Sequence, residues 1–241
     1  MSKSSNFIAY IFLLLTVTFW AGNFIVGKFA SFYEVPPFSL NFYRWFFAWL
    51  ILAPFTIPEI FKNKDYIKEN YKLFLVLGVT SITVFNSIVY YSLNFTQVIS
   101  GVLMISTIPV MIMFISSILK IERTNIFQIL GVLFSFTGVI LIITKANLEI
   151  LKNLDFNKGD ITMVIAMFSW ALYSALLKKQ TYKLSQLSLL QVIISFGLLF
   201  LIPIYFIEYQ LGFRIQLEKP FVMILSYVVL FPGLASFILW I

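Results

Sequence analysis

The sequence predicts an all-α membrane protein, an inverted repeat of five-helix units with eight transmembrane helices present of an expected ten. Three observations predict this class. Of the 241 residues, 61% are hydrophobic and only 11% are charged, against roughly 45–50% and 25% in soluble domains. The apolar residues form long runs between clusters of charge, and short motifs recur at an offset of 150 residues. Lipid is therefore the expected solvent.

Eight apolar runs have the length of about 20 residues that a helix needs to cross a bilayer core of about 30 Å. No run alternates polar and apolar residues as a lipid-facing β-strand would. The first run is too long for a signal peptide and lacks a small-residue cleavage site, so we expect it to stay attached. The predicted spans are approximately Ile8–Ala30, Pro36–Ile57, Leu73–Leu93, Val98–Leu119, Ile126–Ile143, Ile161–Leu177, Leu187–Ile207 and Phe221–Ile241.

Basic residues predict the orientation of these spans. If the amino terminus is cytoplasmic, ten Lys and Arg residues lie in cytoplasmic connections and five in outer ones. Because Lys and Arg concentrate in cytoplasmic loops, we predict a multi-pass protein of the cell membrane with its amino terminus inside. The excess of 17 basic over 10 acidic residues is then a topology signal, and no nucleic-acid partner is expected.

An internal repeat is the most informative pattern. Trp20-Ala21 followed by Lys28 in the first span recurs as Trp170-Ala171 followed by Lys178 in the sixth, 150 residues later. Prolines of the second and seventh spans, Pro54 and Pro203, are 149 residues apart. Because the unit holds five spans, the second copy enters the bilayer from the opposite side. Such inverted repeats are a recurring plan of secondary transporters, and we place the copies at residues 1–145 and 158–241.

The motifs of both copies resemble the EamA-type branch of the drug/metabolite transporter superfamily. The resemblance covers nearly the whole chain and implies a carrier of ten spans, both termini cytoplasmic, that moves small metabolites or drugs, often outward. It rests on Phe19-Trp20-Ala21-Gly22-Asn23-Phe24, Arg44 followed by Ala48, Ile108-Pro109-Val110 through Lys120-Ile121-Glu122-Arg123, Gly131 with Gly138, and Gly159-Asp160 through Ser169-Trp170-Ala171-Leu172-Tyr173-Ser174.

The chain departs from the ten-span plan by ending inside its eighth span. The offset of 150 maps Val98–Ile143, which holds the fourth and fifth spans, onto positions beginning near 248 and ending near 293, beyond Ile241. We therefore expect this C-terminally truncated form to lack two helices and to transport poorly, if at all.

Polar residues within the spans are candidates for a transport pathway. Those of the third span, from Thr83 to Asn94, share one helix face and either line the pathway or bond neighbouring helices. We predict that the first, third, fourth and sixth helices surround a polar cavity. The predicted cavity and substrate-binding residues are Trp20, Asn23, Arg44, Asn86, Tyr90, Trp170 and Tyr173.

Arg44 is the sharpest single feature, because an intramembrane Arg costs roughly 2.5–3.5 kcal/mol on the lenient insertion scale. None of the ten acidic residues lies inside a predicted span. Its candidate partners are an anionic group on the substrate, carbonyls freed near Pro109, or water; snorkelling or a purely folding role is the alternative. The first of these predicts a substrate with a carboxylate or phosphate.

Prolines and glycine within two spans predict hinges. Pro109 in the fourth span, and Pro232 with Gly233 in the eighth, interrupt the helical hydrogen-bond ladder. Lys28, near a span end, is expected to act as a snorkelling anchor.

The side-chain inventory disfavours an enzyme. The chain has no His and no Cys, so it offers neither the usual nucleophiles and bases nor a metal cluster, and no cofactor is expected. A structural or assembly protein of the membrane, or an inactive fragment, is the alternative to a carrier. The expected partners are a small-molecule substrate and the lipid bilayer; Gly131 and Gly138 leave a homodimer open.

Overall fold

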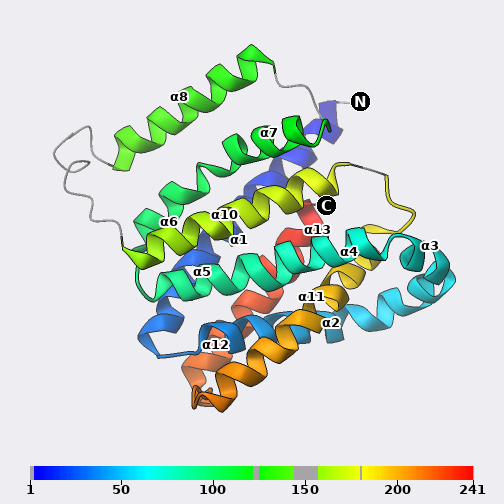
Figure 1. The fold of residues 1–241 in the computed structure, drawn as a ribbon, viewed down its shortest axis with the longest axis vertical. Helices are drawn as coiled ribbons and strands as arrows, with labels where there is room; N and C mark the ends of the chain where they lie inside the picture. The colour runs from blue at the N-terminus through cyan, green and yellow to red at the C-terminus, as the bar shows by residue number, and fades with distance from the viewer. Residues whose placement is uncertain (1–2, 122–124, 144–156, 180, 241) are drawn as a thin grey trace.

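The computed structural model describes residues 3–121, 125–143, 157–179 and 181–240. Every regular element in these ranges is a helix, which confirms the predicted all-α class. Figure 1 shows the long helices side by side, with α3 at one end of the bundle and the connection from α11 to α12 at the opposite end.

The first half of the chain forms five helical segments. The third segment is continuous but changes to a π-helix in its middle, and the fourth is broken in two. The elements in order are α1 (Lys3–Phe32), α2 (Pro37–Lys62), α3 (Lys64–Glu69), α4 (Tyr71–Gly78), the π-helix η1 (Val79–Phe85), α5 (Asn86–Leu93), α6 (Val98–Ile105), α7 (Ile108–Ile118) and α8 (Ile126–Ile143).

The second half forms three such segments, and the last again contains a π-helix. Its elements are α10 (Lys158–Leu177), α11 (Gln186–Gln210), α12 (Lys219–Val228), the π-helix η2 (Val229–Ala235) and α13 (Ser236–Trp240). A capping box begins α10, where the Asn157 side chain accepts from the backbone N–H of Asp160 and the Asp160 carboxylate accepts from that of Asn157.

Six helical segments in the described part of the chain are long and apolar enough to cross a membrane. Two further apolar stretches are shorter, Ile108–Ile118 and Ile126–Gly138. The predicted fourth span is interrupted at Ser106 and Thr107, and Pro109 is then the second residue of α7. A proline is tolerated there because the first turn of a helix has no backbone acceptor for its missing N–H.

The second and seventh spans are longer than predicted. We expected them to end at Ile57 and Ile207, whereas α2 continues to Lys62 and α11 to Gln210. Glu59 and Glu208 are therefore the acidic residues of two long helices rather than parts of the connections.

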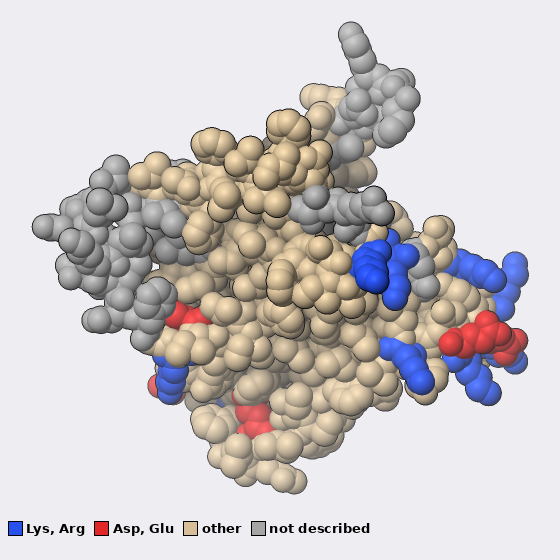
Figure 2. Space-filling view, turned by 45° about the horizontal axis from the view of Figure 1, so that its top comes forward, with Lys and Arg blue, Asp and Glu red and all other residues tan. Residues whose placement is uncertain are grey.

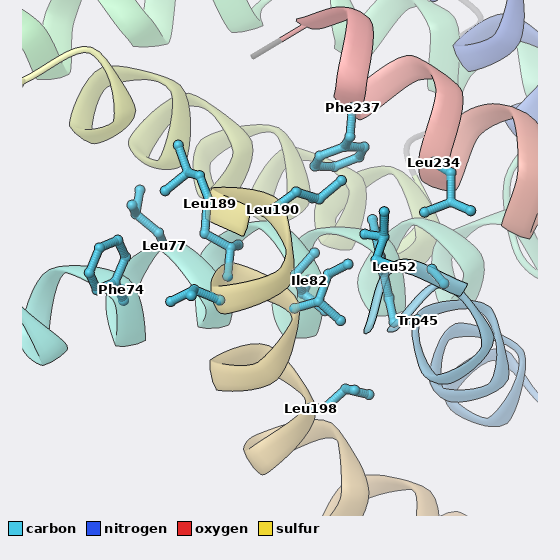
Figure 3. Packing of buried hydrophobic residues seen from close by; sticks show 14 of the residues in the cluster. Trp45, Leu52, Phe74, Leu77, Ile82, Leu189, Leu190, Leu198, Leu234 and Phe237 are labelled. Carbon is cyan, nitrogen blue, oxygen red and sulfur yellow. The ribbon is translucent and has the colours of Figure 1, made fainter. Parts of the chain in front are cut away.

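The main hydrophobic core lies between α2, α4, η1, α11 and α13. Trp45 and Leu52 of α2 belong to one cluster with Phe74 and Leu77 of α4, and Figure 3 shows Ile82, Leu189 and Leu190 between these two pairs. Helices α4 and α11 approach most closely at two glycines: a Cβ on Gly78 would lie 2.6 Å from the backbone nitrogen of Gly197. Small residues allow such close packing of membrane helices.

The two π-helices occupy equivalent places in the halves of the chain. They span residues 79–85 and 229–235, so 150 positions separate them, the offset of the sequence motifs. The residue after each bonds the carbonyl five positions back: Asn86 Nδ2 donates to Ser81 O (2.8 Å) and Ser236 Oγ to Phe231 O (3.2 Å). This matching register supports the repeat, and the boundaries at 1–145 and 158–241 stay our proposal.

Each π-helix has a local cause. In the third span, the hydroxyls of Thr80 and Ser81 donate to the carbonyls of Val76 and Leu77, the acceptors that a regular α-helix reserves for backbone N–H groups. In the eighth span, Pro232 has no N–H to donate. Local disruption of the ladder therefore accompanies both segments.

The first helix of each half packs against a span of the other half. Helix α1 packs against α12, η2 and α13, while α10 packs against α4, η1 and α5. Helices α2 and α11 pack against each other. Figure 2 shows charged side chains gathered mainly at one edge of the visible face, with uncharged surface over most of the rest, as expected for a surface in contact with lipid.

Candidate functional site

Arg44 lies at the centre of a polar cluster in the bundle. Its side chain is 1% exposed. The Nη1 atom donates to Asn23 Oδ1 (3.3 Å), Asn86 Oδ1 (2.8 Å) and Tyr90 Oη (2.7 Å), and Nη2 donates to the carbonyl of Pro232 (2.9 Å). All four acceptors are neutral groups.

The cluster is cross-linked by further hydrogen bonds. Tyr90 Oη donates to Asn23 Oδ1 (2.8 Å), so α1, α2 and α5 meet at one point. Asn41, one turn before Arg44 in α2, donates to the carbonyl of Ile82 (2.9 Å) and to Ser87 Oγ (2.8 Å). Ile82 and Pro232 are 150 positions apart, so α2 bonds an equivalent π-helix carbonyl in each half.

The buried polar atoms without a partner among the described residues include the donors Arg44 Nε and Trp45 Nε1 and the acceptor Asn41 Oδ1 of this cluster, together with the donor Tyr173 Oη of α10. The guanidinium carbon of Arg44 lies 4.9 Å above the Trp45 ring. A Cβ on Gly233 would lie 3.5 Å from Arg44 Nε, so this glycine leaves room beside that nitrogen. Buried polar groups are nearly always paired, so unpaired donors mark where an acceptor could bind.

An aromatic cluster adjoins Arg44 and is made by α1, α2, η1, α10 and α13. Trp170 is its hub, with ring centroids 4.6 Å from Phe85, 5.3 Å from Trp20 and 5.0 Å from Tyr173. Phe237 lies 5.5 Å from Trp170 and 5.1 Å from Trp45. Edge-to-face and tilted contacts of this kind are favourable, and Trp45 joins the aromatic cluster to the polar one.

The predicted site residues fall into these two neighbouring groups. Asn23, Asn86 and Tyr90 surround Arg44, while Trp20, Trp170 and Tyr173 form the aromatic cluster. All but the half-buried Trp20 are less than 5% exposed. The side chains pack on one another here, and their role in binding substrate stays a prediction.

Sequence reasoning missed Asn41, Trp45, Phe85 and Phe237. Asn41 had a usable signal, because it lies three residues before Arg44 on the same face of α2. An aromatic residue in an apolar span carries no such signal. The carbonyl that accepts from Arg44 belongs to Pro232, whereas the carbonyls near Pro109 were one of the candidate partners that we named.

The third-span stripe bonds neighbouring helices, one of the two roles we left open, and lining of a pathway stays a prediction. Asn86 and Tyr90 bond Arg44, whereas Thr83 donates to the carbonyl of Gly197 (2.8 Å) and Ser87 accepts from Asn41. Asn94, at the end of the stripe, is exposed.

Other predicted features have structural partners. Pro109 follows the break between α6 and α7, and Pro232 and Gly233 lie inside η2; a hinge role for them stays a prediction. Lys28 Nζ donates to the carbonyls of Leu93 (2.8 Å) and Thr96 (3.0 Å), at and just beyond the end of α5, where a cation suits the helix dipole; its role as an anchor stays a prediction. The family-like turn at 122–124 lies outside the described residues.

A surface cavity of about 450 Å³ opens at the end of the bundle where α2 and α12 begin. Its walls mix apolar residues with polar and charged ones, including Glu34, Asn94, Arg214 and Glu218. The buried residues Val35, Leu40, Phe221 and Tyr90 belong to one hydrophobic cluster, and Val35 and Phe221 also line the cavity. Tyr90 of the same cluster bonds Arg44 (2.7 Å).

At the opposite end, Tyr182 lies in the connection between α10 and α11. Burial and the neighbouring Tyr66 raise the pKa of Tyr182 to about 12. Its hydroxyl, like that of Tyr66, has no hydrogen-bond partner among the described residues.

Comparisons with known proteins agree with this architecture. The family model described as "EamA-like transporter family" matches residues 7–144, more than half of the chain. The chain belongs to this family. The matched residues are nearly the same as residues 1–145, which we assign to the first copy of the repeat. This EamA-family protein is thus a multi-pass, all-α membrane protein of a transporter family.

Curated relatives of this EamA-family chain carry transporter names. An "Uncharacterized transporter" of Archaeoglobus fulgidus is 30% identical over 197 residues, which is 80% of this chain and 65% of the relative. The "Uncharacterized transporter YyaM" of Bacillus subtilis is 30% identical over 170 residues, 69% of this chain and 54% of the relative. The chain thus spans between half and two thirds of these relatives. No solved structure matches it.

Proposed function

We propose that this protein is a secondary carrier that moves a small metabolite or drug by alternating access, and that Arg44 binds a carboxylate or phosphate on the substrate. The observation that carries the proposal is the buried guanidinium whose four acceptors are all neutral. A fully buried charge without a counter-charge is costly. A substrate anion would supply the missing charge during binding.

The unpaired donors support a substrate that offers acceptors. Arg44 Nε, Trp45 Nε1 and Tyr173 Oη are buried donors without acceptors in the described chain. Carboxylate and phosphate oxygens only accept, and a guanidinium binds them in a bidentate geometry. For binding, the polar cluster must open, since its members now bond one another.

The repeat supports alternating access. In inverted-repeat carriers, two related halves exchange conformations about a central site. Here the π-helices η1 and η2 contribute the carbonyls of Ile82 and Pro232 to neighbouring residues of α2. These two contacts support a site that residues of both proposed copies share.

The distribution of basic residues supports a cytoplasmic amino terminus and hence placement in the cell membrane. On this orientation, α3 and the connection between α10 and α11 face the cytoplasm and carry Lys64, Lys68 and Lys183. The cavity beside Arg214 faces outward. Positive charge then concentrates inside.

Transport in liposomes tests the proposal. Purified protein is reconstituted, and uptake is measured for a panel of labelled carboxylates, phosphates, neutral sugars and amines. R44Q should slow flux of the anionic probes by about tenfold to a hundredfold, the equivalent of a charge-assisted hydrogen bond. R214Q, which removes the same charge from an exposed loop, is the matched control.

The rival functions give different results in this assay. A structural membrane protein or inactive fragment shows no flux of any probe above empty liposomes. Equal flux by wild type and a correctly inserted R44Q would remove Arg44 from substrate binding. An enzyme would convert a probe chemically, which chromatography of the recovered probe detects.

A further inference from the structure

Two acidic residues lie where their own helices disfavour them. Glu59 lies three residues before the last residue of α2, and Glu208 lies two residues before the last residue of α11. A carboxylate near a helix carboxyl terminus is repelled by the helix dipole. Each of these carboxylates instead bonds the amino-terminal end of the other helix.

Glu208 caps the beginning of α2. Its Oε2 accepts from the backbone N–H and from the hydroxyl of Ser39, both at 2.6 Å, and Oε1 accepts from the backbone N–H of Phe38 (3.2 Å). Pro36, the residue before α2, provides no side-chain cap. Glu208 is 6% exposed, so these charge-assisted bonds are shielded from water.

Glu59 bonds the beginning of α11, where the Ser185 side chain also accepts from the backbone N–H of Ser188. Its Oε1 accepts from the backbone N–H of Ser185 (2.7 Å), and its Oε2 accepts from the hydroxyls of Ser185 (2.5 Å) and Ser188 (2.6 Å). Glu59 and Glu208 are 149 positions apart, and so are Ser39 and Ser188. The two caps are therefore equivalent contacts of the repeat at opposite ends of one helix pair.

Further polar bonds join the same two helices between the caps. Trp49 Nε1 donates to Ser195 Oγ (2.9 Å), and Gln191 Nε2 donates to the carbonyl of Trp49 (3.3 Å). The hydroxyls of Tyr43 and Tyr205 lie 3.1 Å apart. The α2–α11 pair is thus bonded at both ends and along its length in a single state.

We infer that Glu59 and Glu208 are paired positioning residues that keep α2 and α11 together as one rigid unit, so that Arg44 keeps one height in the bundle throughout the cycle. This inference rests on the proposed carrier function, because only a carrier has a transport cycle. Opening at either end then occurs between this pair and the helices around it. If the caps worked alternately, one would be open while the other is closed, whereas both are closed here.

The test uses spin labels, for which the absence of cysteine in the native chain is an advantage. One pair, F61C with Q186C, reports the Glu59 end, and another, P37C with Y209C, reports the Glu208 end. In liposomes, each pair should give one narrow distance population. E208Q should add a longer population at its own end only, and E59Q at the other end only.

Controls make the outcome specific. S39A removes one of three bonds to Glu208 and should broaden the distance distribution of the P37C–Y209C pair less than E208Q does. E59Q, at a half-buried position, keeps the test open if E208Q does not fold. Two populations at either end of the wild-type protein, or E208Q and E59Q distances identical to wild type, would overturn the inference.

Transport separates positioning from folding. In variants that transport, a shifted α2 misplaces Arg44, so the KM for an anionic probe should rise about five- to tenfold, the effect of roughly one hydrogen bond. A folding defect alone would lower Vmax at an unchanged KM. If wild type transports no probe, the proposed function fails, while the spin-label distances still decide whether the helices stay paired.

Discussion

At the scale of single residues, Arg44 shows how a membrane interior can hold a charge without an opposite one. Amide, phenol and carbonyl oxygens surround its terminal nitrogens, and the Trp45 ring lies below the guanidinium. Each acceptor is a dipole fixed by its own helix. Dipoles of this kind stabilise a cation without cancelling its charge, so the charge stays available to a ligand.

Tyr90 is the residue whose loss should disturb this cluster most selectively. Tyr90→Phe removes one acceptor of Arg44 and one donor to Asn23. A buried polar group left without its partner costs about 1–3 kcal/mol, so the apparent Tm in detergent should fall by roughly 3–10 °C. The control is Tyr91→Phe, at a half-buried neighbour whose ring packs on Phe95. Equal shifts in the two variants would refute a special role for the Tyr90 hydroxyl.

The residues around Arg44 were predictable to different degrees. Asn23, Asn86 and Tyr90 were found because a polar side chain in an apolar span is costly and must have a partner. Trp45 and Phe237 were not found because aromatic residues occur in cores, on lipid-facing surfaces and in binding sites alike. Only its contacts in space, such as the 4.9 Å between the Arg44 guanidinium carbon and the Trp45 ring, give Trp45 a role.

At the scale of helices, hydropathy predicts length better than it predicts interruptions. The long helices follow from runs of apolar residues, but η1 and η2 depend on where hydroxyls and Pro232 divert backbone carbonyls. The ends of α2 and α11 were placed too early because Glu59 and Glu208 resemble edge charges. Their partners lie on another helix, at Ser185 and Ser39, and no local pattern reveals them.

The contact between α4 and α11 gives a prediction about one methyl group. In Gly78→Ala the new Cβ would lie 2.6 Å from the Gly197 nitrogen and 2.7 Å from the Ile193 carbonyl oxygen. Both are backbone atoms of α11, so the helices must separate, at a cost of about 1–3 kcal/mol. Thermal unfolding in detergent should show the loss. Gly131→Ala in α8, with no atom within 4 Å of the new Cβ, should leave the Tm unchanged or raise it; equal losses would contradict this packing.

At the scale of the whole molecule, the repeat relates contacts that are far apart in the chain. The offset of 149 to 150 residues connects Trp20 with Trp170, η1 with η2, and Glu59 with Glu208. An odd number of spans in each unit requires that equivalent positions lie on opposite sides of the membrane. Lys64 in α3 and Phe213 after α11, 149 residues apart, are such a pair, and both are exposed.

Single cysteines at these two positions test the inversion directly, because the native chain contains none. In intact cells, a thiol reagent that cannot cross the membrane should label F213C and leave K64C unlabelled until the cells are opened, since the Lys-rich end is expected to face the cytoplasm. Figure 1 places α3 and the connection from α11 to α12 at opposite ends of the bundle. Labelling of K64C alone from outside would agree with the inverted repeat but would show that the amino terminus faces outward. Labelling of both from outside would show that equivalent positions share one side, which an inverted repeat does not allow.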